Sequence, residues 1–516
     1  MNMTTAGESF TGRARRALSN EQLQSALATA TTKHKAARAE ALPLLGAEWE
    51  RLREQARAVK NHTLENLDYY LAEFAANVER LGGRVFWAED AAAANRYIVE
   101  VARRHGARTA VKSKSMMTEE VELNRALDAA GVRPIETDLG EYIVQLAGER
   151  PSHITAPAIH KSRHEIARLF AEKFETECGP ETERITALAR RMLRREFAAA
   201  DLGITGVNFA IAESGTIVLI ENEGNIRLST SLPRVHVALM GIEKVIPRLA
   251  DLDVFLKILP RAASGQKITS YVSLLTGLKH SPRDEGPEEL HVVVIDNGRT
   301  AMLANPSLRE SLNCIRCGAC LNACPVYQKI GGHAYGWIYP GPIGAVLTPQ
   351  LTGRQQAADL PFASTLCGAC RDVCPVKIAI PEMLLHLRHE IKEHQQLDAP
   401  SGLRGADSSP GTPGLLATAA PKQTTPVGFK QRIVGRLEKL SFKLWARAMQ
   451  KASRYVRAGR LARLAQAAFG RRANGTSALP LKAWARRRDV PMLAPRTFRE
   501  RWAESKSKAA RRAGRR

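Results

Sequence analysis

The chain has 516 residues, of which 44% are hydrophobic, and 76 Lys and Arg stand against 52 Asp and Glu, a formal net charge of +24. A chain of this length and apolar content buries a core in two to four domains, so disorder throughout is excluded. Residues 401–516 hold 28 basic and 5 acidic residues, which leaves 48 and 47 for residues 1–400. The first four-fifths of the chain therefore carries nearly equal numbers of basic and acidic residues, and the excess positive charge lies in a C-terminal tail.

Hydropathy and cysteine usage point to the cytoplasm. The sequence has no run of about 18 uncharged apolar residues, the length that would suggest a membrane-spanning helix. The start, MNMTTAGESF, lacks the basic and apolar regions of a secretory signal. Seven of the eight cysteines fall between Cys314 and Cys374. In a reducing compartment, thiols set this close together are typical of a metal site rather than of disulfides.

The pattern along the chain predicts an α/β protein. Residues 1–60 are rich in Ala, Glu, Arg and Leu, which favours a helical lead-in. From residue 84 onwards, apolar runs of strand length alternate with helical patterns, which indicates an open, mostly parallel sheet. The predicted strands are 84–89, 108–113, 133–136, 209–213, 216–221, 235–241 and 291–296, and the predicted helices are 90–105, 117–130, 161–175 and 182–199.

The predicted organisation has five parts. Gly- and Pro-rich loops carry the cysteines of a small α-helical segment, and a stretch rich in Pro, Gly, Ser and Thr follows as a linker. The last part alternates Arg and Lys with Leu, Ala and aromatic residues, as amphipathic helices do. In chain order the parts are a helical N-terminal segment (1–60), an α/β domain (61–300), a two-cluster ferredoxin-type domain (301–395), a flexible linker (396–427) and a basic, partly helical tail (428–516).

The first cysteine run, CIRCGACLNACPV, has the spacing C-x2-C-x2-C-x3-C-P. This is the run of bacterial ferredoxins, in which three thiolates hold one iron–sulfur cluster and the fourth reaches its neighbour. The alternative is zinc, which usually takes two separate C-x2-C pairs. The spacing therefore favours iron and sulfur. The cysteines of this run are Cys314, Cys317, Cys320 and Cys324.

The second run, STLCGACRDVCPVKI, repeats the pattern with one cysteine fewer, and Ser364 stands where the leading cysteine should be. Crossed ligation assigns Cys314, Cys317, Cys320 and Cys374 to one cluster and Cys324, Cys367 and Cys370 to the other. The second site then has three thiolates. It holds either a three-iron centre or a four-iron cluster whose last iron has another ligand or an open position, and Ser364 is either that ligand or a structural residue.

The α/β region carries weaker signals. It has no G-x-G-x-x-G after a strand and no Walker run, so a dinucleotide site of the usual kind is not expected. Three acidic residues there are either a general base or nucleophile or ordinary solvated and ion-pair residues, and these are Glu213, Glu221 and Glu223. Three basic residues either bind a substrate carboxylate or form ordinary salt bridges, and these are Lys112, Lys114 and Arg234. No residue is assigned a catalytic role. The loop around His333 and Tyr335, between the cysteine runs, is either a docking surface or a cover that shields the clusters.

The residues resemble those of the lactate utilisation protein B family of iron–sulfur proteins. The resemblance covers residues 60–395 closely and the tail more loosely. It is carried by the two cysteine runs together with the segments SKSMMTEEVELN, ETDLGEYIVQLAGERPSHITAPAIHK, GITGVNFAIAESGTIVLIENEGN, PRVHVALMGIEK and LAPRTFRERW. It implies an α/β domain similar to the sugar-phosphate isomerase and CoA-transferase fold, and two four-iron clusters held by the two sets of cysteines named above.

The resemblance also implies a function. We expect the electron-transfer subunit of a three-protein system that oxidises L-lactate to pyruvate without NAD, with two partner subunits, one cysteine-rich and one sharing the α/β domain, and an unidentified electron acceptor. The basic tail is expected to touch the inner face of the cytoplasmic membrane or an acidic partner, or to be solvated, rather than to bind nucleic acid. The alternatives are an iron–sulfur redox sensor whose tail binds nucleic acid and a transferase-like enzyme with structural clusters.

Overall fold

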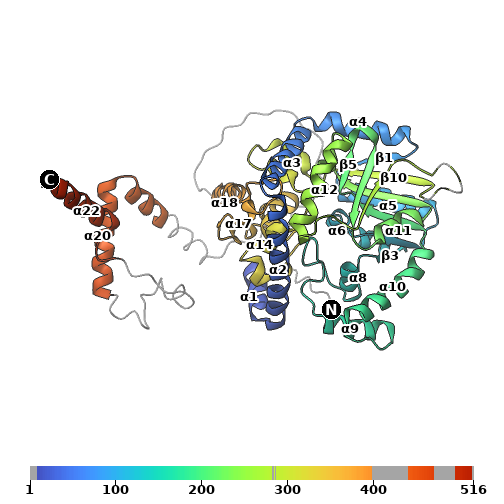
Figure 1. The fold of residues 1–516 in the computed structure, drawn as a ribbon, viewed down its shortest axis with the longest axis horizontal. Helices are drawn as coiled ribbons and strands as arrows, with labels where there is room; N and C mark the ends of the chain where they lie inside the picture. The colour runs from blue at the N-terminus through green and yellow to red at the C-terminus, as the bar shows by residue number, and fades with distance from the viewer. Residues whose placement is uncertain are drawn as a thin grey trace, which may run out of the picture. The chain divides into compact units, whose positions relative to one another are not determined.

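The computed structural model describes residues 8–279, 281, 284, 286–397, 440–469 and 494–513. The chain divides into two compact units, Met1–Arg404 and Gly405–Arg516 (Figure 1). Most of the predicted linker, from residue 398 to residue 427, lies outside the described residues, as do positions 428–439 and 470–493 of the predicted tail.

A six-stranded sheet forms the centre of the first unit, in the order β1-β10-β7-β4-β2-β3, and every pairing in it is parallel. The predicted open parallel sheet is therefore confirmed. The inner strands read as unbroken apolar runs because both faces are covered: Val292, Val293 and Val294 of β10 are all buried. The strands are β1 (Arg84–Ala88), β2 (Thr109–Lys112), β3 (Arg133–Glu136), β4 (Leu202–Gly206), β7 (Val235–Gly241) and β10 (Glu289–Ile295).

Helices follow these strands as βα units require. The predicted helix 117–130 is two helices, because Glu122 adopts a left-handed conformation (φ 52°) between them. The break follows Glu120, whose carboxylate pairs with buried Arg299. The helices of this region are α5 (Ala91–Arg104), α6 (Met116–Glu120), α7 (Leu123–Ala129), α8 (Leu139–Leu146), α9 (Arg163–Phe174), α10 (Thr182–Ala198), α11 (Asn225–Ser231), α12 (Leu249–Ser264) and α13 (Arg299–Ala304).

A smaller sheet lies beside the first in the order β8-β5-β6-β9. Strands β5 and β6 form an antiparallel hairpin in which Phe209 pairs with Val218, and Gly215 makes its turn with φ 67°. The strands are β5 (Phe209–Ile211), β6 (Thr216–Glu221), β8 (Val245–Ile246) and β9 (Tyr271–Leu275). Short 3₁₀ turns occur at Pro43–Leu45, Ala212–Ser214, Ile242–Lys244, Arg309–Asn313, His333–Tyr335 and Leu360–Phe362.

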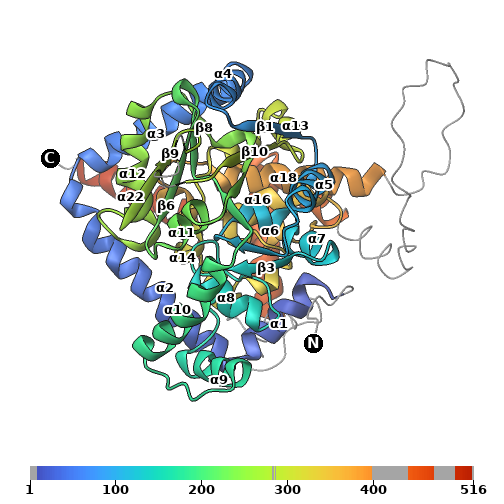
Figure 2. The same ribbon diagram turned by 90° about the vertical axis from the view of Figure 1, so that its right-hand side faces the viewer.

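The N-terminal helices join the α/β region to the cysteine segment. Helix α2 contacts α12 on one side and both α14 and α15 on the other, and all of them share one hydrophobic core (Figures 1 and 2). The N-terminal helices are α1 (Phe10–Ser19), α2 (Glu21–Ala41), α3 (Glu48–Glu65) and α4 (Leu67–Arg80). The cysteine segment holds α14 (Ala319–Ala323), α15 (Tyr327–Ile330), α16 (Gly341–Thr352), α17 (Ala369–Asp372) and α18 (Ile380–Leu397).

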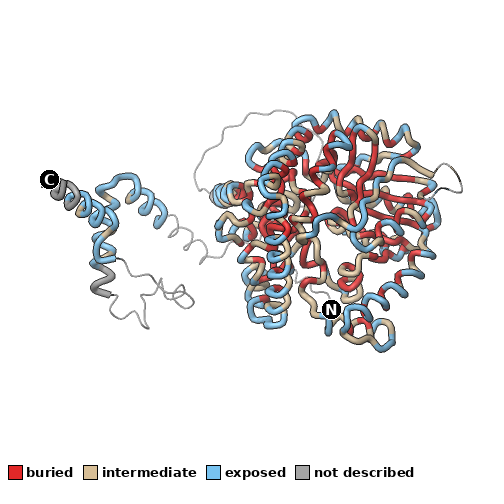
Figure 3. Tube along the Cα trace, viewed as in Figure 1, coloured by how far each residue is buried: buried red, intermediate tan, exposed pale blue. Residues whose placement is uncertain are grey.

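The described parts of the tail are mostly helical, as predicted: residues 440–449 are largely helical, and α20 (Ala452–Phe469) and α22 (Phe498–Ala513) follow. Within these parts, none of the residues whose burial is described is buried (Figure 3). Large apolar side chains such as Phe442, Trp445 and Trp502 are exposed. The tail therefore presents apolar and basic groups together.

Candidate metal centre

The two cysteine loops have the same backbone conformation. In the first loop, Arg316 and Gly318, on either side of Cys317, have φ of 59° and 74°. In the second loop, Leu366 and Gly368 flank Cys367 with φ of 54° and 86°. Left-handed residues alternating with ordinary ones turn successive backbone N–H groups towards a common point, an arrangement found at anion and iron–sulfur sites. The repeat seen in the sequence is thus a structural repeat.

Four thiols form the first group: Cys314, Cys317, Cys320 and Cys374. Burial raises the pKa of Cys317, and its neighbours Cys374 and Cys314 raise it further. The pKa of Cys320 is also raised by burial and then by the other three thiols. For Cys374, burial is again the main cause of a pKa of about 11, and Cys314 contributes. The structure therefore brings one cysteine of the second run to three of the first.

The remaining three cysteines of the two runs form the second group: Cys324, Cys367 and Cys370. Burial raises the pKa of Cys370 to about 12, with further contributions from Cys324 and Cys367. Burial raises the pKa of Cys324 too, and Cys367 adds to it. Cys367 itself is exposed, and the Thr365 side chain, which hydrogen-bonds to its thiol, lowers its pKa.

This donor set fits iron–sulfur clusters. All seven thiols are free, and backbone N–H groups donate to the sulfurs of six of them, all but Cys314. The N–H of Ile378, for example, lies 3.4 Å from Cys374 Sγ. Hydrogen bonds to sulfur stabilise thiolates and tune cluster potentials. The other donors are Ala319 to Cys317, Ile343 to Cys320, Val326 and Tyr327 to Cys324, Ala369 to Cys367, and Arg371 to Cys370.

Tyr335 lies between the two thiol groups. Its side chain is buried, and its pKa is raised first by burial and then by Cys324 and Cys320, one thiol from each group. Tyr339, later in the same loop, is also buried, whereas His333 is exposed. Burial of the two tyrosines favours the interpretation of this loop as a cover over the clusters.

Two arginines of the N-terminal helices reach the first thiol group. Arg53 of α3 is buried and donates to the carbonyl oxygen of Cys374 at 2.8 Å and to two carbonyls of α17. Arg38 of α2 donates to the carbonyl of Val373 at 3.1 Å. Burial lowers the pKa of Arg38, and Cys317 and Cys374 act in the opposite direction. Sequence patterns do not reveal these two residues, because they stand among other basic residues in two helices far along the chain from the cysteine runs.

A buried charge network connects the α/β sheet to the first cysteine loop. Arg299 donates to both carboxylate oxygens of Glu120 at 2.8 Å and to Glu243 at 2.8 Å. Glu243 also pairs with Arg316 at 3.6 Å, and the Arg316 guanidinium lies 4.8 Å from the ring centroid of Tyr339, whose hydroxyl donates to Glu120 at 2.7 Å. Burial raises the pKa of Glu243, but Arg299 and Arg316 overcome this and hold it at about 2.

The network lies where parallel sheets of this class bind ligands. Glu243 follows β7 and Arg299 follows β10, so both stand at the carboxyl edge of the sheet. Two further cations, the buried Lys60 and the half-buried Lys244, lie beside it, and desolvation lowers the pKa of each to about 8. Cys314 acts on both lysines in the opposite direction. Together with the arginines they place an excess of positive charge beside the first thiol group, which complements thiolate-bound iron.

The cationic candidates of the α/β region are all engaged in ordinary contacts. Lys112 is fully buried and pairs with Glu119 at 3.0 Å and Glu136 at 2.7 Å. Lys114 donates to a backbone carbonyl, and Arg234 pairs with a carboxylate at the surface. Ion pairing was one of the two expected roles of these residues.

The acidic candidates accept hydrogen bonds from backbone N–H groups. Glu213 accepts from Leu249 at 2.6 Å, Glu223 accepts from the N–H of Leu139, and Glu221 accepts from two residues in the first turn of α11. Their role is to hold turns and helix starts, which weakens the case for a transferase that uses one of them as nucleophile.

Family models match the chain in three consecutive parts. These are the LUD domain at residues 71–295, a 4Fe-4S dicluster domain at 310–378 and "Lactate utilisation protein B, C-terminal" at 417–507. The second match decides between iron–sulfur clusters and zinc: the chain carries a 4Fe-4S dicluster domain. The third match shows that the basic tail, where the resemblance is looser, is part of a known architecture.

A lactate utilization protein B of Lysinibacillus sphaericus (strain C3-41) is 41% identical over 510 residues, which cover 98% of this chain and 99% of the relative. This chain belongs to the lactate utilisation protein B family. A lactate utilization protein B of Shouchella clausii (strain KSM-K16) is 46% identical over 388 residues, 75% of this chain and 81% of the relative. An uncharacterized electron transport protein of Escherichia coli (strain K12), YkgF, is 46% identical over 394 residues, 76% and 82% of the two chains. Among the described residues of this family member, no helix is long and apolar enough to cross a membrane.

Proposed function

We propose that this chain is the electron-transfer subunit of a multi-protein, NAD-independent system that oxidises L-lactate to pyruvate. The oxidation releases two electrons and two protons, and two iron–sulfur clusters supply one-electron steps between lactate and an acceptor. The observation that carries the proposal is the pair of thiol groups, which share one compact unit with the LUD domain. The carboxyl edge of the sheet in that domain is joined to the first thiol group by the ion pair between Glu243 and Arg316.

The cluster ligands follow from how the thiols are grouped. One cluster takes Cys314, Cys317, Cys320 and Cys374, and the other takes Cys324, Cys367 and Cys370. The support is that the pKa values of five thiols are raised by other thiols of the same group, and these five are Cys317, Cys320, Cys374, Cys324 and Cys370. The second cluster then has three thiolates, which suits a three-iron centre or a four-iron cluster with one non-cysteine position.

The exposed Cys367 suggests where a redox partner approaches. Five of the seven thiols are buried and Cys314 is partly buried, whereas Cys367 faces solvent. The partners are proposed to be two other lactate utilisation subunits, one cysteine-rich and one sharing the α/β domain, and an electron acceptor. The protein is proposed to lie in the cytoplasm and to contact the membrane surface through its basic tail.

The decisive experiment compares Cys317→Ala with Cys178→Ala in the assembled system under anaerobic conditions. Cys178 belongs to neither thiol group, so its variant is the matched control. We expect Cys317→Ala to lose one cluster, measured as iron content and by EPR, and to abolish lactate-dependent reduction of an added acceptor dye. Cys178→Ala should keep both. Full lactate oxidation by Cys317→Ala would refute the electron-transfer role.

A redox sensor with a nucleic-acid-binding tail is the second candidate, and the charge of the tail favours it. Residues 401–516 carry 28 basic and 5 acidic residues. Electrostatic binding of a basic tail to nucleic acid falls steeply as the salt concentration rises. A sensor must in addition bind one nucleic-acid sequence in preference to others. Selective retention of one DNA sequence that changes with the cluster oxidation state would support the sensor against the electron-transfer subunit.

A further inference from the structure

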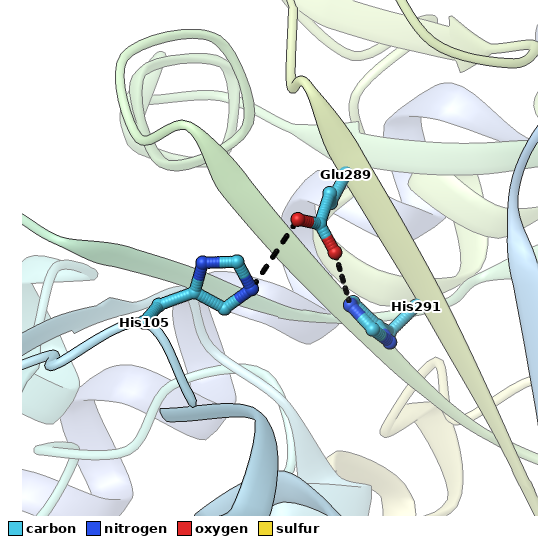
Figure 4. Close-up of side chains that lie close together, drawn as sticks. All are labelled: His105, Glu289 and His291. Carbon is cyan, nitrogen blue, oxygen red and sulfur yellow. Dashed lines mark ion pairs between the residues drawn. The ribbon is translucent and has the colours of Figure 1, made fainter. Parts of the chain in front are cut away.

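Three side chains converge at the amino edge of the six-stranded sheet. Glu289 and His291 are two residues apart on β10, so both point to the face that α5 covers, and His105 stands directly after α5. The Glu289 carboxylate lies between the two imidazole rings, with one oxygen towards each (Figure 4). The distances are 3.4 Å from His105 Nε2 to Glu289 Oε1 and 3.5 Å from His291 Nε2 to Glu289 Oε2.

These atoms have the spacing of metal ligands rather than of hydrogen-bonded groups. His291 is fully buried, and neither its Nε2 nor Glu289 Oε2 has a hydrogen-bond partner. Two such groups facing each other without a bond are costly unless a third species satisfies both. In a tetrahedral zinc site with bonds of about 2.0–2.1 Å, neighbouring ligand atoms lie about 3.3–3.4 Å apart. The two separations involve different oxygens of Glu289, and one ligand atom from each of the three residues lies within 4.8 Å of the other two, so a rotation of the carboxylate is enough to bring one oxygen to that spacing from both rings.

Tyr97 of α5 completes the arrangement. Its hydroxyl lies 2.8 Å from His291 Nδ1, the ring nitrogen that faces away from Glu289. When Nδ1–H donates to the tyrosine oxygen, the lone pair of Nε2 is free for a metal, which is how histidine ligands are usually oriented.

We propose that His105, Glu289 and His291 bind a divalent zinc ion, with Tyr97 as a positioning residue and water as the fourth ligand. Two histidines with one carboxylate and an open position are a familiar zinc ligand set. The ion would tie the end of α5 to the start of β10. This site is separate from the cysteine clusters, since none of its residues belongs to either thiol group.

The positive charge of Arg84 on β1 disfavours binding of a zinc ion at this site. Its guanidinium lies 3.8 Å from Glu289 Oε2 and repels a cation bound to the same carboxylate. Removing this charge should therefore strengthen zinc binding, whereas removing a ligand should weaken it. Loss of binding on removal of the His105 imidazole, which carries no negative charge, distinguishes a ligand set from general electrostatic attraction.

The test is a zinc titration against a chromophoric chelator, using untagged, cluster-loaded protein under anaerobic conditions so that the thiols are already occupied. We expect one zinc per chain, an affinity at least about 100-fold lower in His105→Ala and Glu289→Gln, and about 10-fold lower in Tyr97→Phe. Arg84→Gln should bind several-fold more tightly. His389→Ala is the matched control, because His389 forms an exposed pair with Glu393 at 3.2 Å on α18, and it should bind like the wild type.

Equal zinc binding by the wild type and Glu289→Gln would overturn the proposal, and so would the absence of zinc from the wild type. Iron content and circular dichroism verify that each variant is folded. Should a variant fail to fold, anomalous scattering from wild-type crystals at the zinc edge decides: density between the three side chains supports the site, and density elsewhere or none refutes it.

Discussion

At the scale of single residues, Ser364 accounts for the difference between the two cysteine loops. It occupies the position that Cys314 has in the first loop, three residues before the central cysteine. Its hydroxyl accepts a hydrogen bond from the N–H of Leu366 at 3.1 Å, and its carbonyl accepts from Arg388 at 3.1 Å. These contacts give Ser364 a structural role in the turn, which leaves the second thiol group one ligand short.

Ser364→Cys should supply that ligand. We expect the variant to hold a four-iron cluster at the second site that resists oxidative loss of iron, because four thiolates then surround it. EPR of the oxidised protein measures this as the loss of any three-iron signal. Ser364→Ala is the control. If Ser364 is not an iron ligand, the alanine variant keeps the wild-type spectrum, and an altered spectrum would show that the serine oxygen binds iron.

Arg299 is the residue on which the buried network depends. It is 1% exposed and neutralises Glu120 and Glu243, which are buried as well. Arg299→Met should lower the free energy of unfolding by about 3–5 kcal/mol, because it removes the cation that contacts both buried carboxylates at 2.8 Å. Denaturant unfolding followed by circular dichroism measures the loss. Arg234→Met, which breaks an exposed pair, should cost less than about 1 kcal/mol. Similar losses in the two variants would contradict the importance of the network.

At the scale of elements, helix α3 positions the second cysteine loop. The chain between Cys324 and Cys367 is long, and Cys374 must still reach the first thiol group. Arg53 of α3 donates to the carbonyls of Arg371, Asp372 and Cys374, so it caps the end of α17 and fixes this cysteine. Burying a guanidinium is tolerated here because several carbonyls accept its hydrogen bonds.

Arg53→Ala should therefore loosen Cys374 and lower the iron content of the first cluster. Arg53→Lys should restore only part of it, since an ammonium cannot make the same forked contacts. Iron per chain and the rate of cluster loss to a chelator measure the effect. Arg51→Ala on the same helix removes an exposed arginine and is the matched control. Unchanged cluster stability in Arg53→Ala would refute the positioning role.

Prediction of the elements succeeded where local pattern and tertiary context agree. The alternation of strands and helices from β1 to β3 is predicted by the sequence, because each strand is a short apolar run and each helix has apolar residues at the 3.6-residue helical spacing. Strand β4 is not among the predicted strands, and it contains two glycines, Gly203 and Gly206, which are uncommon in strands. They are strand residues that allow close approach: a Cβ on Gly203 would lie 1.9 Å from the carbonyl oxygen of Ser229 in α11.

At the scale of the whole molecule, body and tail differ in charge and in burial. Residues 1–400 are nearly neutral and enclose the clusters, whereas none of the tail residues whose burial is described is buried. A family model, "Lactate utilisation protein B, C-terminal", matches residues 417–507, so this basic segment belongs to a known family architecture. Its exposed Phe442, Trp445 and Trp502 among basic residues suit the surface of an anionic membrane.

Deleting residues 401–516 should leave both clusters intact and abolish binding to vesicles that contain anionic lipid. The expected reason is electrostatic, with about 1 kcal/mol for each basic residue near the surface, so high salt should also release the full-length protein. Cosedimentation with anionic and with neutral vesicles measures the binding. Equal cosedimentation of the full-length and truncated proteins would contradict a membrane role for the tail.

The sequence by itself determined the class of the protein. It predicts a parallel α/β domain, two cysteine runs of ferredoxin spacing and a basic tail, because the spacing of apolar residues, the spacing of thiols and the charge are local properties of the chain. Only the tertiary structure showed that Arg38, Arg53 and Arg316 surround the first thiol group, and that His105 meets Glu289 and His291. These contacts join residues up to hundreds of positions apart. They arise from packing α2 and α3 between the sheet and the cysteine segment, and from laying α5 across β10, which no local pattern encodes.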